Sequence, residues 1–122
     1  MFELTIEDEF AAAHFLRGYK GKCERMHGHN YKVQVFVAAS SLNKTGLAVD
    51  FGDLKKMLSS VISKLDHNVL DELPGFKKVN PSAENIAKYI YDNLVKIIKI
   101  KGVKLKKVTV WETAKASASY GR

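Results

Sequence analysis

Four histidines are the residues of this sequence whose spacing points most directly to chemistry: His14, His27, His29 and His67. His27 and His29 flank one glycine, and residues two apart on a strand project from the same face. His14, which ends an alternating segment, can supply a third imidazole from a neighbouring strand. Three nitrogen ligands with an open fourth position are typical of catalytic zinc, whereas structural zinc usually takes more cysteine than the single one present. The spacing predicts a metal site, with zinc favoured and nickel, copper or iron allowed.

Cys23 and the Asp66/His67 pair are candidates for proton transfer. Cys23 lies in sequence among cations that favour the thiolate, namely Lys20, Lys22 and Arg25. The alternative is a small buried hydrophobic residue, since free cysteines are commonly buried. Asp66 can orient the neighbouring imidazole as a general acid or base, provided that a loop turns the two side chains together.

Two further carboxylates stand next to predicted elements. Glu112 continues the apolar stripe of Val108 and Val110, so it lies either at the wet end of a strand or in a site for a cationic or amide-like ligand edge. Asp50 precedes an amphipathic helix, and we expect it to have a structural role in capping or a loop hydrogen bond.

Alternating apolar residues predict the strands that must position these groups. The first runs from Phe2 to His14, and the second begins at His27 and continues to Ala38. A third strand carries Val108, Val110 and Glu112, and residues 114–120 can form a short last strand.

Two helices are expected between the strand pairs. Residues 54–65 carry apolar side chains at helical spacing, and a second helix carries Ile86, Ile90 and Leu94, with Asn80 as its N-cap candidate and Pro81 in its first turn. The order is ββααββ, which predicts an α+β fold in one domain over residues 1–122: an antiparallel four-stranded sheet with two helices on one face. Its two open edges favour a homo-oligomer.

Charge and composition narrow the classes of partner. The chain has 122 residues and a net charge of +7, which favours an anionic partner such as nucleic acid, an acidic membrane surface or a phosphorylated small molecule. Much of the excess lies in residues 96–107, where lysines along a helix end and a strand are typical of a solvated face. No apolar run approaches the roughly 20 residues of a membrane span, and no secretory leader pattern is present. With one cysteine, these features predict a cytoplasmic protein without an internal disulfide.

Six ordered blocks of the chain resemble the 6-pyruvoyltetrahydropterin synthase and 6-carboxytetrahydropterin synthase family. They are residues 10–14, Cys23 with residues 27–31, and residues 49–51, 65–67, 81–85 and 111–113. They cover the chain almost end to end at the family's spacings, which makes the match far more specific than an isolated His-Gly-His.

The resemblance implies the tunnelling fold (T-fold), with trimers that close a barrel, hexamers from two stacked trimers, and active sites between subunits. The zinc ligands it implies are His14, His27 and His29. Cys23 would act as base or acid, and Asp66 with His67 would form a relay contributed by a neighbouring subunit.

The implied substrate is 7,8-dihydroneopterin triphosphate. Its triphosphate suits the positive net charge and the basic loop that contains Arg17, Lys20, Lys22 and Arg25. Glu112 would anchor the pterin, because one carboxylate can accept both the ring N–H and the exocyclic amine. Ser82 would offer a hydroxyl to the ring, while Ala83 stands where the family usually has a second Thr or Ser.

Spacing also indicates a product. The three residues between Cys23 and His27 resemble the 6-carboxy-5,6,7,8-tetrahydropterin synthases of the queuosine (7-deazaguanine) pathway, lyases that release acetaldehyde and triphosphate. Pyruvoyl-forming enzymes carry a longer insertion there, and a hydroxymethyl-pterin branch has glutamate in place of the cysteine, for which Glu24 is available. A basic nucleic-acid-binding module is the non-enzymatic alternative, but it leaves the joint spacing of the blocks unexplained.

Overall fold

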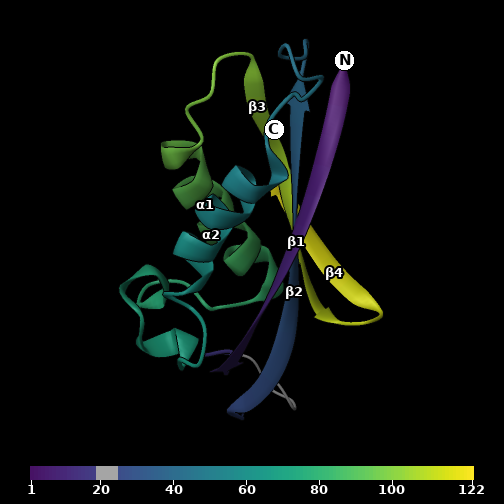
Figure 1. Cartoon of the computed structure of the whole chain (residues 1–122). Helices are drawn as coiled ribbons and strands as arrows, with labels where there is room; N and C mark the ends of the chain where they lie inside the picture. The colour runs from purple at the N-terminus through teal and green to yellow at the C-terminus, as the bar shows by residue number, and fades with distance from the viewer. Residues whose placement is uncertain (19–24) are drawn as a thin grey trace.

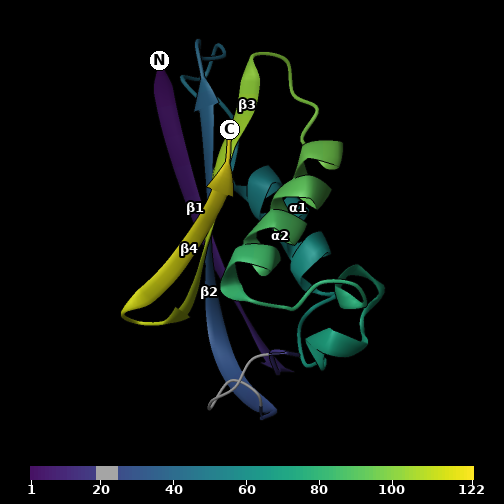
Figure 2. The same cartoon turned by 180° about the vertical axis from the view of Figure 1, so that it is seen from behind.

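The computed structural model describes residues 1–18 and 25–122, so Cys23, Lys20, Lys22 and Glu24 lie outside the described residues. Four antiparallel strands form one sheet in chain order: β1 (Phe2–His14), β2 (His27–Ala39), β3 (Val103–Thr113) and β4 (Ala116–Gly121). Helices α1 (Phe51–Ile62) and α2 (Ala83–Ile97) both cover the same face of this sheet (Figure 1), as the reverse view also shows (Figure 2). The short helices η2 (Leu70–Glu72) and η3 (Pro74–Phe76) connect α1 to α2. The expected ββααββ arrangement is confirmed, with β1 and β4 at its two edges.

The histidines lie on the same side of β1 and β2 as the buried core residues, because side chains alternate between the two faces of a strand. On β1 the buried residues Phe10 and His14 share one face, and on β2 the buried Tyr31 has the same parity as His27 and His29. The antiparallel register of β1 and β2 places His14 opposite His27, and Ala12 opposite His29. The three imidazoles therefore meet at one end of the sheet, on the face that packs against the helices.

The helix boundaries follow local capping chemistry. Asp50 is the N-cap of α1, and its side chain accepts a hydrogen bond from Gly52 N at 2.7 Å, which confirms its structural role. The N-cap of α2 is Ser82, whose Oγ accepts from Asn85 N at 3.2 Å. The prediction of Asn80 as the cap was wrong, because its side-chain oxygen accepts hydrogen bonds from Arg17 instead.

The lysines of residues 96–107 lie mainly in water. All of them are exposed except Lys106, which is half-buried on β3. Lys107 covers the Phe36 ring on the sheet face that the helices leave open, with Nζ 4.6 Å from the ring centroid. Within the described residues, no helix is long and apolar enough to cross a membrane.

Candidate metal centre and active site

Three strands bring four potential metal ligands together at the end of the sheet. His14, His27, His29 and Glu112 each offer one ligand atom, and these atoms all lie within 4.8 Å of one another. We call this group the His/Glu cluster. Its histidine ring centroids are 4.6 to 5.2 Å apart. The side chain of His14 is only 2% exposed, whereas that of Glu112 is 28% exposed, so the cluster opens to solvent on the Glu112 side.

Backbone carbonyls orient two of the imidazoles. His14 Nδ1 lies 2.7 Å from the carbonyl oxygen of Pro81, and His27 Nδ1 lies 2.7 Å from that of Arg25. A carbonyl accepts but cannot donate, so each Nδ1 carries a proton and Nε2 is the nitrogen that each ring turns toward the cluster. The two Nε2 atoms are 3.1 Å apart. This is hydrogen-bond distance, and it is also close to the separation of about 3.3 Å between two nitrogen ligands of one tetrahedral zinc, so the pair fits a shared metal ion.

His29 faces the cluster with an unpaired nitrogen. Its Nε2 lies 2.9 Å from Glu112 Oε1, yet this buried atom is in no hydrogen bond, because the approach lacks hydrogen-bond geometry. Burial lowers the pKa of His29, although the Glu112 carboxylate acts in the opposite direction. The lowered pKa favours the neutral imidazole, which is the form that binds metal. A buried imidazole nitrogen that makes no hydrogen bond is a further sign that the donor set suits zinc.

Glu112 sits closer to the histidines than the sequence indicated. Besides its contact with His29, Oε1 lies 3.7 Å from His14 Nε2. Glu112 falls at a register shift between β3 and β4, and such irregularities re-aim side chains near functional sites. Next to it is a hollow of about 220 Å³ lined also by Ala83, Glu84 and residues 116–118 of β4. The carboxylate is therefore placed to reach either a metal ion or a ligand in this hollow.

The structure supplies the loop geometry that the Asp66/His67 pair needs. His67 adopts a left-handed backbone conformation, with φ of 59°, which turns its Nδ1 to within 3.0 Å of Asp66 Oδ1. Ala11 N donates to the same oxygen at 2.9 Å, and this hydrogen bond is the main cause of the lowered pKa of Asp66. The His67 side chain is 82% exposed. Asp66 thus stays ionised and orients an imidazole that is largely exposed.

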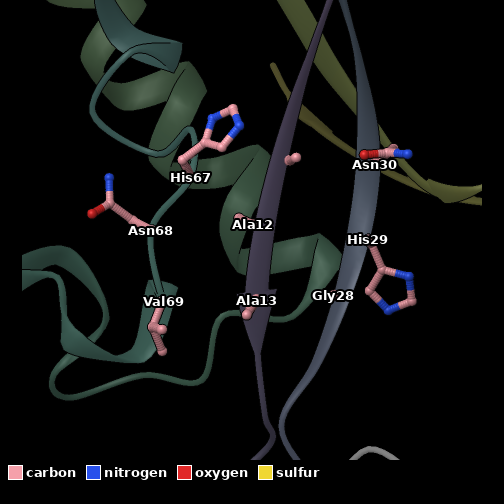
Figure 3. A pocket seen from close by; sticks show the side chains of 9 residues that line it. Ala12, Ala13, Gly28, His29, Asn30, His67, Asn68 and Val69 are labelled. Atoms are coloured by element: carbon pink, nitrogen blue, oxygen red, sulfur yellow. The ribbon is translucent and has the colours of Figure 1, made fainter.

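This pair lies beside β1 and outside the His/Glu cluster. His67 N donates to the Ala11 carbonyl at 2.6 Å and Ala13 N donates to the Asn68 carbonyl at 3.1 Å, which ties the segment to the edge of the sheet. A hollow of about 430 Å³ borders it and is also lined by Gly28 and His29. In Figure 3 the ring of His67 lies beside β1 and the ring of His29 lies on the far side of β2, so that both strands stand between them in this view. Within the described residues, His67 is therefore not one of the potential ligands of the cluster, although the hollow beside it reaches His29.

Two other predicted groups have defined partners. The Ser82 hydroxyl caps α2, and it is Ala83 that lines the hollow beside Glu112. Arg17, which the sequence placed in a basic loop, donates its guanidinium hydrogen bonds to backbone carbonyls of its own chain. The orienting carbonyls of Pro81 and Arg25 were missed by sequence reasoning, because a backbone acceptor has no side-chain signature.

The sequence and the architecture are similar to those of known proteins. A family model described as 6-pyruvoyl tetrahydropterin synthase matches residues 3–122. The chain is 36% identical over 109 residues to a putative 6-carboxy-5,6,7,8-tetrahydropterin synthase of Archaeoglobus fulgidus, covering 89% of this chain and 86% of the relative. It is 45% identical over 97 residues to the human 6-pyruvoyl tetrahydrobiopterin synthase, covering 76% of this chain and 66% of that one.

The structural match extends over the whole chain. The 6-pyruvoyl tetrahydropterin synthase of Caenorhabditis elegans superposes with a TM-score of 0.86 at 33% identity, covering 100% of this chain and 97% of that one. The four-stranded sheet with two helices on one face is therefore the tunnelling fold. Together with the family match, this places the chain in the 6-pyruvoyl tetrahydropterin synthase family of pterin synthases.

Proposed function

We propose that the protein is a zinc-dependent lyase that converts 7,8-dihydroneopterin triphosphate to 6-carboxy-5,6,7,8-tetrahydropterin, with release of acetaldehyde and triphosphate, in queuosine (7-deazaguanine) biosynthesis. The observation that carries this proposal is the His/Glu cluster, in which three imidazoles and one carboxylate converge at a solvent-open end of the sheet. His14, His27 and His29 would hold the zinc. Zinc bound there would supply Lewis acidity that lowers the pKa of hydroxyl and neighbouring C–H groups of the substrate side chain.

Glu112 is the proposed anchor for the pterin ring. Glu112 lines the hollow together with Ala83 and residues of β4, where a flat ligand could reach it. A carboxylate accepts hydrogen bonds from the ring N–H and the exocyclic amine together, which fixes the orientation of the ring relative to the metal ligands. Ser82 would donate its hydroxyl proton to the ring while its oxygen accepts from Asn85 N.

Cys23 and the Asp66/His67 pair are the proposed proton-transfer groups. The hydrogen bond from Ala11 keeps Asp66 ionised, and Asp66 in turn fixes the His67 ring, so that Nε2 can take or give a proton at the substrate side chain. Cys23 would act on the opposite face of the substrate. The basic residues near Cys23 would attract the triphosphate.

The site would be completed between two copies of the chain. The Asp66/His67 pair lies at the β1 edge, whereas the hollow beside Glu112 is lined by residues 116–118 at the β4 edge. Pairing of β4 of one copy with β1 of the next would cover both open edges and bring the relay pair to the cluster of its neighbour. Trimers or hexamers in the cytoplasm are the proposed working form.

A second candidate product is 6-pyruvoyltetrahydropterin, which the 45% identity to the human 6-pyruvoyl tetrahydrobiopterin synthase favours. It would be formed from the same substrate by the same residues. The short spacing of Cys23 and His27 favours the carboxylated product instead.

The test is mass spectrometry of the products formed from 7,8-dihydroneopterin triphosphate by the zinc-loaded protein, with Cys23→Ala as the matched inactive control. The proposal predicts 6-carboxy-5,6,7,8-tetrahydropterin and acetaldehyde, both absent with Cys23→Ala. A pyruvoyl or hydroxymethyl pterin would move the protein to another branch of the family. Unchanged substrate from a metal-loaded oligomer would refute the lyase function.

A further inference from the structure

Arg17 lies where the chain leaves β1, three residues after His14, and its side chain is held by the loop that precedes α2. The guanidinium donates to three backbone carbonyls of that loop, those of Phe76, Lys77 and Val79, at 2.6, 3.1 and 2.7 Å. Its Nε donates to Asn80 Oδ1 at 3.1 Å. Every guanidinium nitrogen is thus bound to a neutral acceptor of the same chain, which is not the arrangement of an anion-binding arginine.

Asn80 completes this contact from the other side. Its Oδ1 also accepts from Arg17 N at 2.9 Å, and its Nδ2 donates to the Arg17 carbonyl at 2.9 Å. The Asn80 carbonyl accepts from Asn85 Nδ2 at 2.9 Å, which connects the loop to the first turn of α2. We call Arg17, Asn80 and the three carbonyls the Arg17 clamp. It fastens the end of β1 to the start of α2.

The positive charge of Arg17 also has a partner within the chain. The Asp71 side chain is 5% exposed, and its Oδ1 accepts from Phe15 N at 3.0 Å. Its Oδ2 is buried without a hydrogen bond, and Arg17 Nε lies 3.8 Å away. A buried carboxylate that lacks a nearby cation is strongly disfavoured, so the charge of Arg17 is needed where it stands.

The clamp surrounds the backbone group that orients a metal ligand. Pro81 follows Asn80 directly, and its carbonyl accepts the Nδ1 proton of His14 at 2.7 Å. Such outer partners fix which imidazole nitrogen faces the metal and how the ring is turned. The clamp holds the chain on both sides of this hydrogen bond: three residues beyond His14 and one residue before Pro81.

From this arrangement we propose that Arg17 is a positioning residue for the metal centre, which acts through Asn80 and the Pro81 carbonyl on the ring of His14. This inference rests on the metal centre of the proposed function. Arg17 thereby has a role different from that of a triphosphate ligand. A lysine at this position keeps the charge but cannot reproduce the planar fork of donors that reaches the loop carbonyls and Asn80 together.

The test is the zinc affinity of Arg17→Lys, measured by competition with a chromophoric chelator. We expect about a tenfold loss of affinity, at the lower end of the range for outer-shell partners. Val37→Ala is the stability control, because Val37 is fully buried near the opposite end of β2 and touches neither clamp nor cluster. It should lower the melting temperature and leave zinc affinity within about twofold. Arg122→Lys is the matched conservative control and should change neither property.

A second readout needs no metal. Nitrogen-15 NMR of the metal-free protein reports which nitrogen of His14 carries the proton, and we expect Nδ1–H in the wild type and a mixture of tautomers in Arg17→Lys. Should Arg17→Lys fail to fold, Asn80→Ala removes the side chain that accepts from Arg17 N and Nε and donates to the Arg17 carbonyl, with the same expected direction.

The outcomes separate this inference from the proposed function. Wild-type zinc affinity and a pure Nδ1–H tautomer in a destabilised Arg17→Lys would overturn the positioning role and leave Arg17 a structural brace. A wild type that binds no zinc would overturn both the inference and the metal-dependent function. If Arg17→Lys loses zinc affinity but the wild type does not turn over the pterin, the proposed function fails and the positioning role stands.

Discussion

The His/Glu cluster and the Asp66/His67 pair are built in opposite ways. The cluster draws on β1, β2 and β3, and its innermost side chain, His14, is almost completely buried. The pair consists of neighbours in sequence, it lies beside the sheet edge, and the His67 ring is 82% exposed. A metal ion can be held by one chain alone, whereas His67 lies beside β1 and is not part of the His/Glu cluster of its own chain.

The same contrast appears in what sets the pKa values. Burial is the main influence on His29 and lowers its pKa, which keeps the imidazole neutral for a metal. A hydrogen bond from Ala11 is the main influence on Asp66 and lowers its pKa, which keeps the carboxylate charged beside His67. The two regions are thus suited to different chemistry, because the cluster can bind a cation and the pair can move a proton.

The largest expected effect separates the two regions by metal content. His27→Ala removes one of the three imidazoles that would bind zinc. Loss of a residue that only positions a ligand typically costs about 10–100-fold in metal affinity, so we expect a larger loss here, together with loss of turnover. His67→Ala should keep zinc in full and lower turnover about 10²–10⁴-fold. Metal analysis of the purified variants, together with turnover, checks both. Loss of zinc from His67→Ala would show that the two regions are not separate.

An intermediate effect concerns Glu112, which lies beside the proposed metal ligands and lines the hollow proposed for the pterin. For Glu112→Gln we expect zinc to remain bound by the three histidines, while the Michaelis constant for the pterin rises about 100-fold through loss of a charge-assisted double hydrogen bond. Isothermal titration with zinc and steady-state kinetics separate the two. A loss of zinc affinity as large as that of His27→Ala would make Glu112 a metal ligand instead.

The smallest effect is the pH dependence of Asp66. Because its folded pKa is lowered, the carboxylate stabilises the fold at pH values above its ordinary pKa of 3.8, and this contribution is lost as the pH falls through the folded pKa. The metal-free wild type should be slightly more stable than Asp66→Asn at pH 6, and the difference should vanish in acid. Urea unfolding at both pH values measures it, and a difference that grows in acid would contradict the lowered pKa.

Much of the fold and the histidine set could be predicted because they depend on local periodicity. Alternation over β1 and β2 placed His14, His27 and His29 on the core face, and the cap at Asp50 follows from its position before α1. These features depend only on residues close in sequence and on one antiparallel pairing.

The remainder depends on long-range or irregular geometry. Asn80 was expected to cap α2, but its side-chain oxygen accepts a hydrogen bond from Arg17 N, 63 residues away in sequence. The position of Glu112 depends on a register shift, and the Asp66/His67 contact depends on a left-handed conformation at a residue other than glycine. No periodic pattern encodes these features.

The most direct test of the shared site is complementation between two inactive variants. His27→Ala lacks a metal ligand and His67→Ala lacks the relay, and co-expression with different tags yields mixed oligomers. If the relay serves the cluster of a neighbouring subunit, random mixing leaves about a quarter of the sites with both groups intact, and activity should return to about that level. If each chain used its own relay, every site would lack one group, and the mixture would be as inactive as its parents.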